Sequence, residues 1–200
     1  MSVLLLTDKD VKDLLTMKDV VEACEKTFSD WGEGRVVCPS KVTLELGEDA
    51  PWPPFKNGLN AMPAYIDWQK SAGIKCVGGS LNNPGWGLPY IIALISLFDP
   101  ETGIFRAIMD GELITNYRTG AQAAVAAKYL AKGHRITLGI IGTGAQGRTQ
   151  LMAFREAFDL VEVVAYDINP EASKKYASEM AETARCPITV VPAAEEVFKK

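Results

Sequence analysis

Three glycines, Gly142, Gly144 and Gly147, carry the strongest sign of chemistry in the sequence, because they are spaced as G-x-G-x-x-G. The run follows an apolar stretch typical of a buried strand and precedes a stretch of helical periodicity, which is the setting that a dinucleotide-binding loop requires. There the first glycine permits a tight turn, the second lets the backbone approach a pyrophosphate, and the third allows the helix to pack closely on the strand. The helix start adds free N–H groups and a positive dipole end, which favour phosphates.

An acidic residue, Asp167, ends the next strand-like stretch, VEVVAYD. A carboxylate at that place typically accepts a hydrogen bond from the adenosine ribose 2′-hydroxyl and repels a 2′-phosphate. The two residues that follow, Ile168 and Asn169, offer no positive charge to a phosphate. The pattern therefore predicts NAD as the cofactor. The alternatives are a Rossmann-like fold with an idle site, or one that binds a flavin or S-adenosylmethionine.

Three cations stand among small and apolar residues: Arg118 in NYRTGA, Lys75 in GIKCVGG and Lys41 in SKVTLEL. A guanidinium is always charged and seeks a carboxylate or a phosphate, so Arg118 either binds an anion or forms half of a structural salt bridge. The two lysines either face solvent or enter a pocket. The residues alone leave both alternatives open for all three.

The elements that must position these residues form two successive patterns. Residues 36–110 consist of consecutive strand-like stretches that end in a hairpin around DPETG, so they predict an antiparallel sheet, with a loop rich in Pro and Gly over 47–58. Residues 112–130 predict an alanine-rich helix. From residue 136 onward, strands and helices alternate as in the βαβαβ half of a doubly wound sheet.

The predicted fold class is therefore α/β, with an N-terminal α+β domain over 1–131 and a Rossmann dinucleotide-binding domain that begins at 132. A complete dinucleotide fold needs a second half, so residues 132–200 are expected to form an incomplete domain. The apolar stretch YIIALISLF would leave a hydrophobic sheet edge without cover, which predicts a homodimer formed through the N-terminal sheet.

Composition excludes several classes of function. The 200 residues carry a net charge of −4, so no basic field exists to hold a nucleic-acid backbone. No apolar stretch is long enough to cross a membrane. Four cysteines without C-x-x-C spacing and one histidine argue against a zinc site and against a disulfide framework, and are typical of a protein in the reducing cytoplasm.

Several of these segments together resemble the ornithine cyclodeaminase/mu-crystallin family, from about Val11 to Val191. The resemblance is carried by MPAY, by GIK, by the hairpin LFDPETG, by the run AIMDGELITNYRTGA and by IIGTGAQG. It implies an N-terminal domain that binds substrate and dimerises, followed by a Rossmann domain. It also implies an NAD-dependent amino-acid oxidoreductase or cyclodeaminase. In such an enzyme a hydride is transferred from or to the α-carbon of the amino acid, and the intermediate is an imine.

The resemblance also implies roles for single residues. Lys41 and Lys75 match positions that hold the substrate carboxylate, and Arg118, followed by Thr119, matches the junction of substrate and cofactor. The cofactor side is matched by Gly142, Gly144, Ala145, Gln146, Gly147 and Asp167. The family's catalytic aspartate falls beyond Lys200, so the catalytic acid or base lies outside this sequence.

One departure bears on the substrate. Ornithine cyclodeaminases typically carry arginine where this chain has Lys41, and a lysine cannot make the two-pronged contact of a guanidinium with a carboxylate. This argues against ornithine. The alternatives within the family are an alanine dehydrogenase, a ketimine reductase, or a non-catalytic NAD(P)H-binding protein like mu-crystallin.

Overall fold

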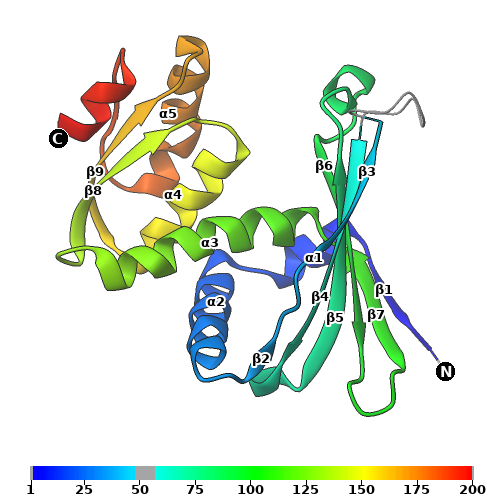
Figure 1. The fold of residues 1–200 in the computed structure, drawn as a ribbon. Helices are drawn as coiled ribbons and strands as arrows, with labels where there is room; N and C mark the ends of the chain where they lie inside the picture. Colours follow the sequence, from blue (N-terminus) through cyan, green and yellow to red (C-terminus); the bar gives the residue numbers. More distant parts are fainter. Residues whose placement is uncertain (1, 48–56, 200) are drawn as a thin grey trace. The chain divides into compact units, whose positions relative to one another are not determined.

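The chain packs into two compact units. The computed structural model describes residues 2–47 and 57–199, so most of the loop predicted over 47–58 lies outside the described residues. The first unit contains the residues up to Leu14 together with Lys26–Thr115, and the second contains Leu15–Glu25 together with the chain from Asn116 onward (Figure 1). The assignment of separate functions to residues 1–131 and 132–200 stays a prediction.

A seven-stranded sheet forms the first unit. Its strands are β1 (Leu4–Leu6), β2 (Val36–Val37), β3 (Val42–Leu46), β4 (Asn57–Ile66), β5 (Ser71–Gly79), β6 (Ile91–Phe98) and β7 (Phe105–Asp110). The order is β1-β7-β6-β5-β4-β2, and β3 also pairs with β4. The strands from β2 to β7 pair antiparallel, which confirms the prediction for residues 36–110. Strand β1 was not anticipated, and it pairs parallel with β7, so the sheet is mixed.

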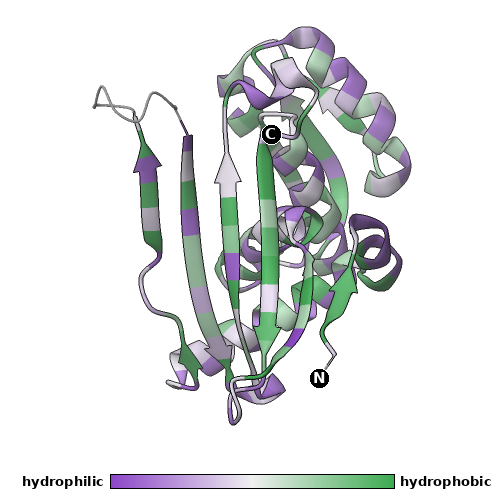
Figure 2. Cartoon of the chain, turned by 90° about the vertical axis from the view of Figure 1, so that its right-hand side faces the viewer, coloured by the Kyte–Doolittle hydropathy of each residue, from purple (hydrophilic) through white to green (hydrophobic). Residues whose placement is uncertain are grey.

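Strand β6 lies inside this sheet, between β5 and β7. The prediction that YIIALISLF forms a hydrophobic edge was therefore wrong, because both edges of the strand are hydrogen-bonded. One face of the strand is exposed instead, and Ile92 and Leu94 on that face are 47% and 55% exposed. Figure 2 shows hydrophobic residues on most strands of this sheet.

Short helices accompany the sheet of the first unit. Helix α1 (Asp8–Leu14) begins with a reciprocal cap, in which Asp10 accepts from the N–H of Thr7 at 2.8 Å and donates its own N–H to the Thr7 hydroxyl. Helix α2 (Met17–Gly32) belongs to the second unit up to Glu25 and to the first unit from Lys26, and Thr16 caps its start in the same way. Two 3₁₀ turns, η1 (Asp67–Gln69) and η2 (Asn83–Trp86), connect later strands.

Apart from Leu15–Glu25, the second unit consists of most of a long helix followed by alternating strands and helices. Its elements are α3 (Glu112–Leu130), β8 (Arg135–Ile141), α4 (Ala145–Ala157), β9 (Asp159–Tyr166), α5 (Pro170–Ala184), β10 (Ile188–Val190) and η3 (Ala194–Lys199). The three strands are parallel in the order β10-β9-β8, which is the 3-2-1 half of a doubly wound sheet. The prediction of a helix over 112–130 is confirmed. The alternating pattern ends in η3, which is a 3₁₀ helix and not an α-helix.

Small side chains let α3 and α4 approach closely in the core of this unit. A Cβ on Gly120 would lie 2.5 Å from the carbonyl oxygen of Thr149, and Ala121 and Ala124 are fully buried. Strand β8 does not match the prediction of burial on both faces, because buried and exposed residues alternate along it. Successive side chains of a strand point to opposite faces, so one face of β8 is buried and the other is exposed among the described residues. No helix in the described part of the chain is long and apolar enough to cross a membrane.

Candidate functional site

The glycine-rich loop joins β8 to α4 with the geometry that each glycine allows. Gly142 has a φ of +92°, a conformation that other residues rarely adopt, and its N–H donates to the carbonyl of Tyr166 at 2.8 Å. Gly147 packs against the strand end, where an added Cβ would lie 2.4 Å from the Gly142 carbonyl oxygen. A Cβ on Gly144 would instead have no atom within 4 Å. Open space therefore adjoins the backbone of the middle glycine.

The start of α4 keeps the unpaired donors of a helix N-terminus. Gly144 occupies the N-cap position and no side chain caps the helix. The N–H groups of the first turn, including those of Ala145 and Gln146, therefore resemble the donors that bind phosphates at other helix starts. The Gln146 side-chain amide donates to the Asn116 side-chain oxygen of α3 at 3.1 Å, which ties the loop end to the helix that carries Arg118.

Asp167 directly follows β9 and bonds to the glycine-rich loop. Its Oδ2 accepts from the Thr143 N–H at 2.7 Å and from the Thr143 hydroxyl at 2.9 Å, and its Oδ1 accepts from the Asn169 N–H at 3.0 Å. These three donors, the Thr143 N–H most strongly, hold the pKa of the Asp167 carboxyl below its usual value. A carboxylate has about four acceptor positions, so one position on Oδ1 is left for a further donor such as a ribose hydroxyl.

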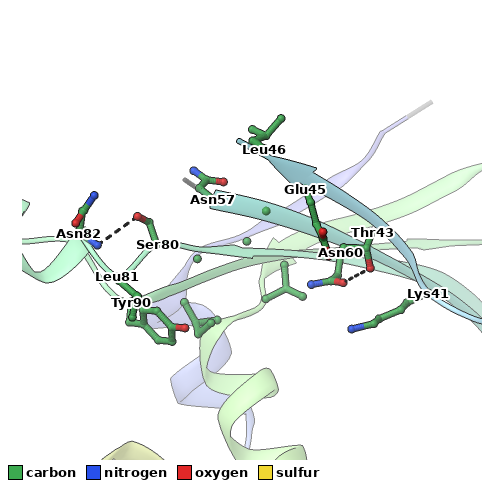
Figure 3. A pocket seen from close by; sticks show the side chains of 15 residues that line it. Lys41, Thr43, Glu45, Leu46, Asn57, Asn60, Ser80, Leu81, Asn82 and Tyr90 are labelled. Carbon is green, nitrogen blue, oxygen red and sulfur yellow. Dashed lines mark hydrogen bonds between the residues drawn. The ribbon is translucent and has the colours of Figure 1, made fainter. Parts of the chain in front are cut away.

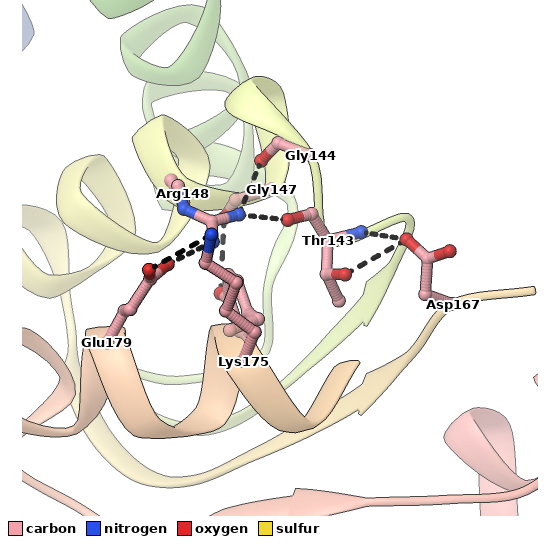
Figure 4. A network of polar contacts seen from close by, with 8 residues as sticks. Thr143, Gly144, Gly147, Arg148, Asp167, Lys175 and Glu179 are labelled. Carbon is pink, nitrogen blue, oxygen red and sulfur yellow. Dashed lines mark hydrogen bonds and ion pairs between the residues drawn. The ribbon is translucent and has the colours of Figure 1, made fainter. Parts of the chain in front are cut away.

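Arg148 holds the loop from the opposite side, as Figure 4 shows. Its guanidinium donates to the carbonyls of Thr143 and Gly144 and forms an ion pair with Glu179 of α5. Neither this arginine nor this glutamate was expected from the sequence. The sequence did contain one signal, because Arg148 is a cation in the first turn of α4 and no acidic residue accompanies it there. The dipole at a helix start disfavours positive charge, so a cation at this place needs another partner.

Arg118 and Thr119 lie half-buried on α3, in the second unit. The Nε of Arg118 is buried and has no hydrogen-bond partner within the described residues. A buried donor without an acceptor is costly, so this atom suits a bound anion. Burial raises the pKa of the neighbouring Cys24 thiol, and the positive charge of Arg118 partly opposes that shift.

The two lysines lie on the first unit, and strand register relates them. Lys75 on β5 pairs with Met62 on β4, and the pairing of Val42 with Ala61, continued by one residue, sets Lys41 against the same Met62. Directly paired residues share a face of the sheet, so both lysines lie on one face, with β4 between them. Two strand spacings separate their backbones by about 10 Å, which two extended lysine side chains can span toward one small anion.

A pocket of about 640 Å³ occupies the same face next to Lys41. Figure 3 shows Lys41 beside Thr43 and Asn60, whose side chains are joined by a hydrogen bond of 2.8 Å. Tyr90 and Ser80 line the other part of the pocket. Lys41 lines this pocket and Lys75 does not, so the pocket contains only one of the two lysines.

Other potential reactive groups do not form a site. The described residues contain no cluster of histidine, cysteine and acidic side chains that could hold a metal ion. The single histidine, His134, stacks on Phe158 with 5.7 Å between ring centroids. All four cysteines, Cys24, Cys38, Cys76 and Cys186, are free thiols.

Comparisons with known proteins give a family match over the whole chain. The family model described as "Ornithine cyclodeaminase/mu-crystallin family" matches residues 1–200. The alanine dehydrogenase of Archaeoglobus fulgidus is 40% identical over 178 residues, which cover 89% of this chain and 52% of that protein.

Two solved structures have the same fold over nearly the whole chain. Thermococcus litoralis Δ1-pyrroline-2-carboxylate reductase in complex with NADH and L-proline is 36% identical, with a TM-score of 0.89, over 99% of this chain and 59% of that one. An archaeal alanine dehydrogenase dimer with bound NAD is 39% identical, also with a TM-score of 0.89, over 98% of this chain and 58% of that one. The chain thus spans little more than half the length of these relatives.

Proposed function

From the premise that this chain belongs to the ornithine cyclodeaminase/mu-crystallin family, we propose that the protein is an NAD-dependent oxidoreductase acting at the α-carbon of a small amino acid or of its imine. The observation that carries the proposal is the presence, in one chain, of two groups of candidate binding residues, one on each unit. The second unit has a glycine-rich loop with an acidic residue after the next strand, and the first unit has two lysines on one face of its sheet.

The residues of the second unit fit NAD. Gly144 leaves open space for a pyrophosphate, Asp167 keeps one acceptor position for a ribose hydroxyl, and the buried Nε of Arg118 lacks an acceptor. In the proposal, Gly142, Gly147, Ala145, Gln146 and Thr119 complete the cofactor contacts. NAD, when bound, supplies a centre that accepts a hydride from the substrate or returns it.

The residues of the first unit fit a carboxylate. Lys41 and Lys75 would bind the carboxylate of the substrate from two strands, and this fixes the α-carbon that must lose or gain the hydride. Holding the reacting carbon in one place is the contribution that these side chains make to catalysis. Neither lysine is proposed to move a proton.

A dehydrogenase or an imine reductase is the finer function that we favour over a cyclodeaminase. Lys41 offers a point charge where a planar guanidinium would form two parallel hydrogen bonds. The similarity to an alanine dehydrogenase and to a pyrroline-carboxylate reductase supports the same choice. In the dehydrogenase direction, loss of a hydride from the α-carbon and of a proton from the amine gives an imine, which water converts to a keto acid with release of ammonia.

We also propose a homodimer formed through the first unit. The face of the sheet opposite to the lysines carries several exposed apolar side chains, Val42, Leu44, Leu59, Ile92 and Leu94, which are between 42% and 68% exposed. An apolar patch of this kind usually marks an interface. The similarity to a structure described as a dimer supports the proposal. The free cysteines support a reducing compartment, the cytoplasm, as the location, and the net charge of −4 argues against nucleic acid as a partner.

The test is turnover by the purified protein. NADH consumption would be followed with pyruvate and ammonia, and with Δ1-pyrroline-2-carboxylate, and NAD reduction would be followed with alanine, proline and ornithine. We expect turnover with at least one keto-acid or imine substrate, and its loss in Lys75→Met. Binding of NADH without turnover of any of these substrates would favour the non-catalytic alternative.

A further inference from the structure

We propose that Arg148 is a positioning residue of the cofactor site, which sets the cofactor preference of Asp167 by holding Thr143 in place. This inference rests on the proposed NAD site and names a residue that the glycine pattern does not include. Its basis is that one loop residue, Thr143, is hydrogen-bonded both to Asp167 and to Arg148. The Asp167 carboxylate accepts from the N–H and hydroxyl of Thr143, while the Arg148 guanidinium donates to the carbonyl of the same residue (Figure 4).

The orientation of the carboxylate depends on Thr143. Two of the three hydrogen bonds that Asp167 accepts come from Thr143, and both end on Oδ2. They leave Oδ1 with the remaining acceptor position, and this is the position proposed for the ribose hydroxyl. A shift of Thr143 would therefore turn the carboxylate away from the geometry that accepts a hydroxyl and repels a 2′-phosphate.

The position of Thr143 in turn depends on Arg148. One amino group of the guanidinium donates to the Thr143 carbonyl and lies 3.4 Å from the Gly144 carbonyl, while the other binds Glu179. The planar fork thus connects the loop to α5 in a fixed direction, which a flexible ammonium does not do. The guanidinium also lies over the ring of Tyr176, 5.5 Å from its centroid, and the arginine side chain is only 29% exposed. Arg148 is therefore held from three sides.

Lys175 provides a matched comparison within the same network. Its ammonium lies 3.6 Å from the carboxylate of Glu179, and its side chain is 71% exposed. It carries the same charge toward the same glutamate, and no described contact links it to the glycine-rich loop. Removing Lys175 tests the effect of charge alone, whereas removing Arg148 tests the contact with the loop.

The experiment is a double-mutant cycle with NADH and NADPH as the probes, measured by fluorescence titration of the purified protein. Arg148→Met keeps the aliphatic stem, and we expect it to weaken NADH binding about tenfold, the scale of one charge-assisted hydrogen bond, and NADPH binding less. The preference for NADH then falls. Lys175→Met should stay within about twofold of the wild type, since exposed ion pairs contribute little.

The second arm of the cycle asks whether Arg148 acts through Asp167. In an Asp167→Asn background, Arg148→Met should change NADH binding by no more than about twofold, because the group through which it acts is already altered. Losses that multiply, or an Arg148→Met variant that matches Lys175→Met, would overturn the proposal. A purely structural role would weaken NADH and NADPH equally.

A variant that does not fold and a wild-type protein that binds no NADH lead to different conclusions. If Arg148→Met does not fold, Arg148→Lys decides: its ammonium can keep the pair with Glu179 but cannot also bind the loop carbonyl in the plane of a fork, so the NADH preference should fall. An unchanged preference in that variant would contradict the proposal. A wild-type protein that binds no NADH refutes the proposed NAD site itself, whereas NADH binding with an unchanged preference in the variants refutes only the role of Arg148.

Discussion

Gly147 lies so close to Gly142 that a Cβ on Gly147 would stand 2.4 Å from the Gly142 carbonyl oxygen. Gly144, three residues earlier, has open space at the corresponding position. The two glycines of one loop are therefore required for different reasons: Gly147 for packing of the folded chain, and Gly144 for the approach of a ligand.

This contrast predicts opposite behaviour of two alanine variants. Gly147→Ala must displace backbone, so it should lower the free energy of unfolding by about 1–3 kcal/mol. Gly144 has a φ of −71°, which alanine also adopts, and an added Cβ would meet no atom. The stability of Gly144→Ala should therefore match that of the wild type, while NADH binding is lost. Thermal unfolding and NADH titration of both variants check this. A loss of stability in Gly144→Ala would contradict the prediction.

Lys75→Met should reduce catalytic efficiency strongly without unfolding the protein. Loss of one partner of a charge-assisted contact with the substrate carboxylate costs about 2–5 kcal/mol, and methionine preserves the aliphatic stem. Lys9→Met, on the exposed surface of α1, serves as the control for loss of one charge. Steady-state kinetics and circular dichroism measure the two effects. If Lys75→Met unfolded, the lysine would be structural.

The Asp167 carboxyl should titrate below its ordinary pKa, because the Thr143 N–H and then the Asn169 N–H stabilise its charged form. A lowered pKa in the folded state means that these bonds stabilise the protein above the unfolded value, about 3.9, and that the stabilisation disappears as the pH falls through the lowered pKa. NADH binding should therefore show no titration of Asp167 between about pH 5 and 8. A ¹³C NMR titration measures the pKa directly, and Thr143→Val should raise it.

The apolar face of the first unit predicts a variant that separates assembly from folding. Leu94 is 55% exposed on that face, so Leu94→Lys places a charge where a second copy would pack. We expect light scattering to show a dimer for the wild type and a monomer for Leu94→Lys, with unchanged circular dichroism. A wild-type protein that is monomeric at micromolar concentration would contradict the proposal.

Local pattern explains what the sequence could predict of the fold. The helix over 112–130 and the alternating elements after residue 136 follow from periodicity within short windows, and both are present in the structure. Strand β1 could not be predicted in the same way. It has three leucines without alternation, and its partner β7 begins about a hundred residues later in the chain.

The same limit applies to the candidate site. The glycine spacing and Asp167 are local signals, so the loop and its acidic neighbour could be identified in advance. Arg148 and Glu179 are 31 residues apart on different helices, and only the packing of α4 on α5 brings them together. The shared face of Lys41 and Lys75 depends on strand register, which composition does not fix.

The second unit takes residues Leu15–Glu25 from a part of the chain that precedes most of the first unit. Met17, Val20 and Val21 of that segment are buried in the same core as Ala121 and Ala124. During synthesis these early residues emerge about a hundred residues before Ala121 and Ala124 of the same core. The two units are therefore interleaved along the sequence, and a fragment that starts at residue 132 would leave its parallel sheet without part of its hydrophobic support.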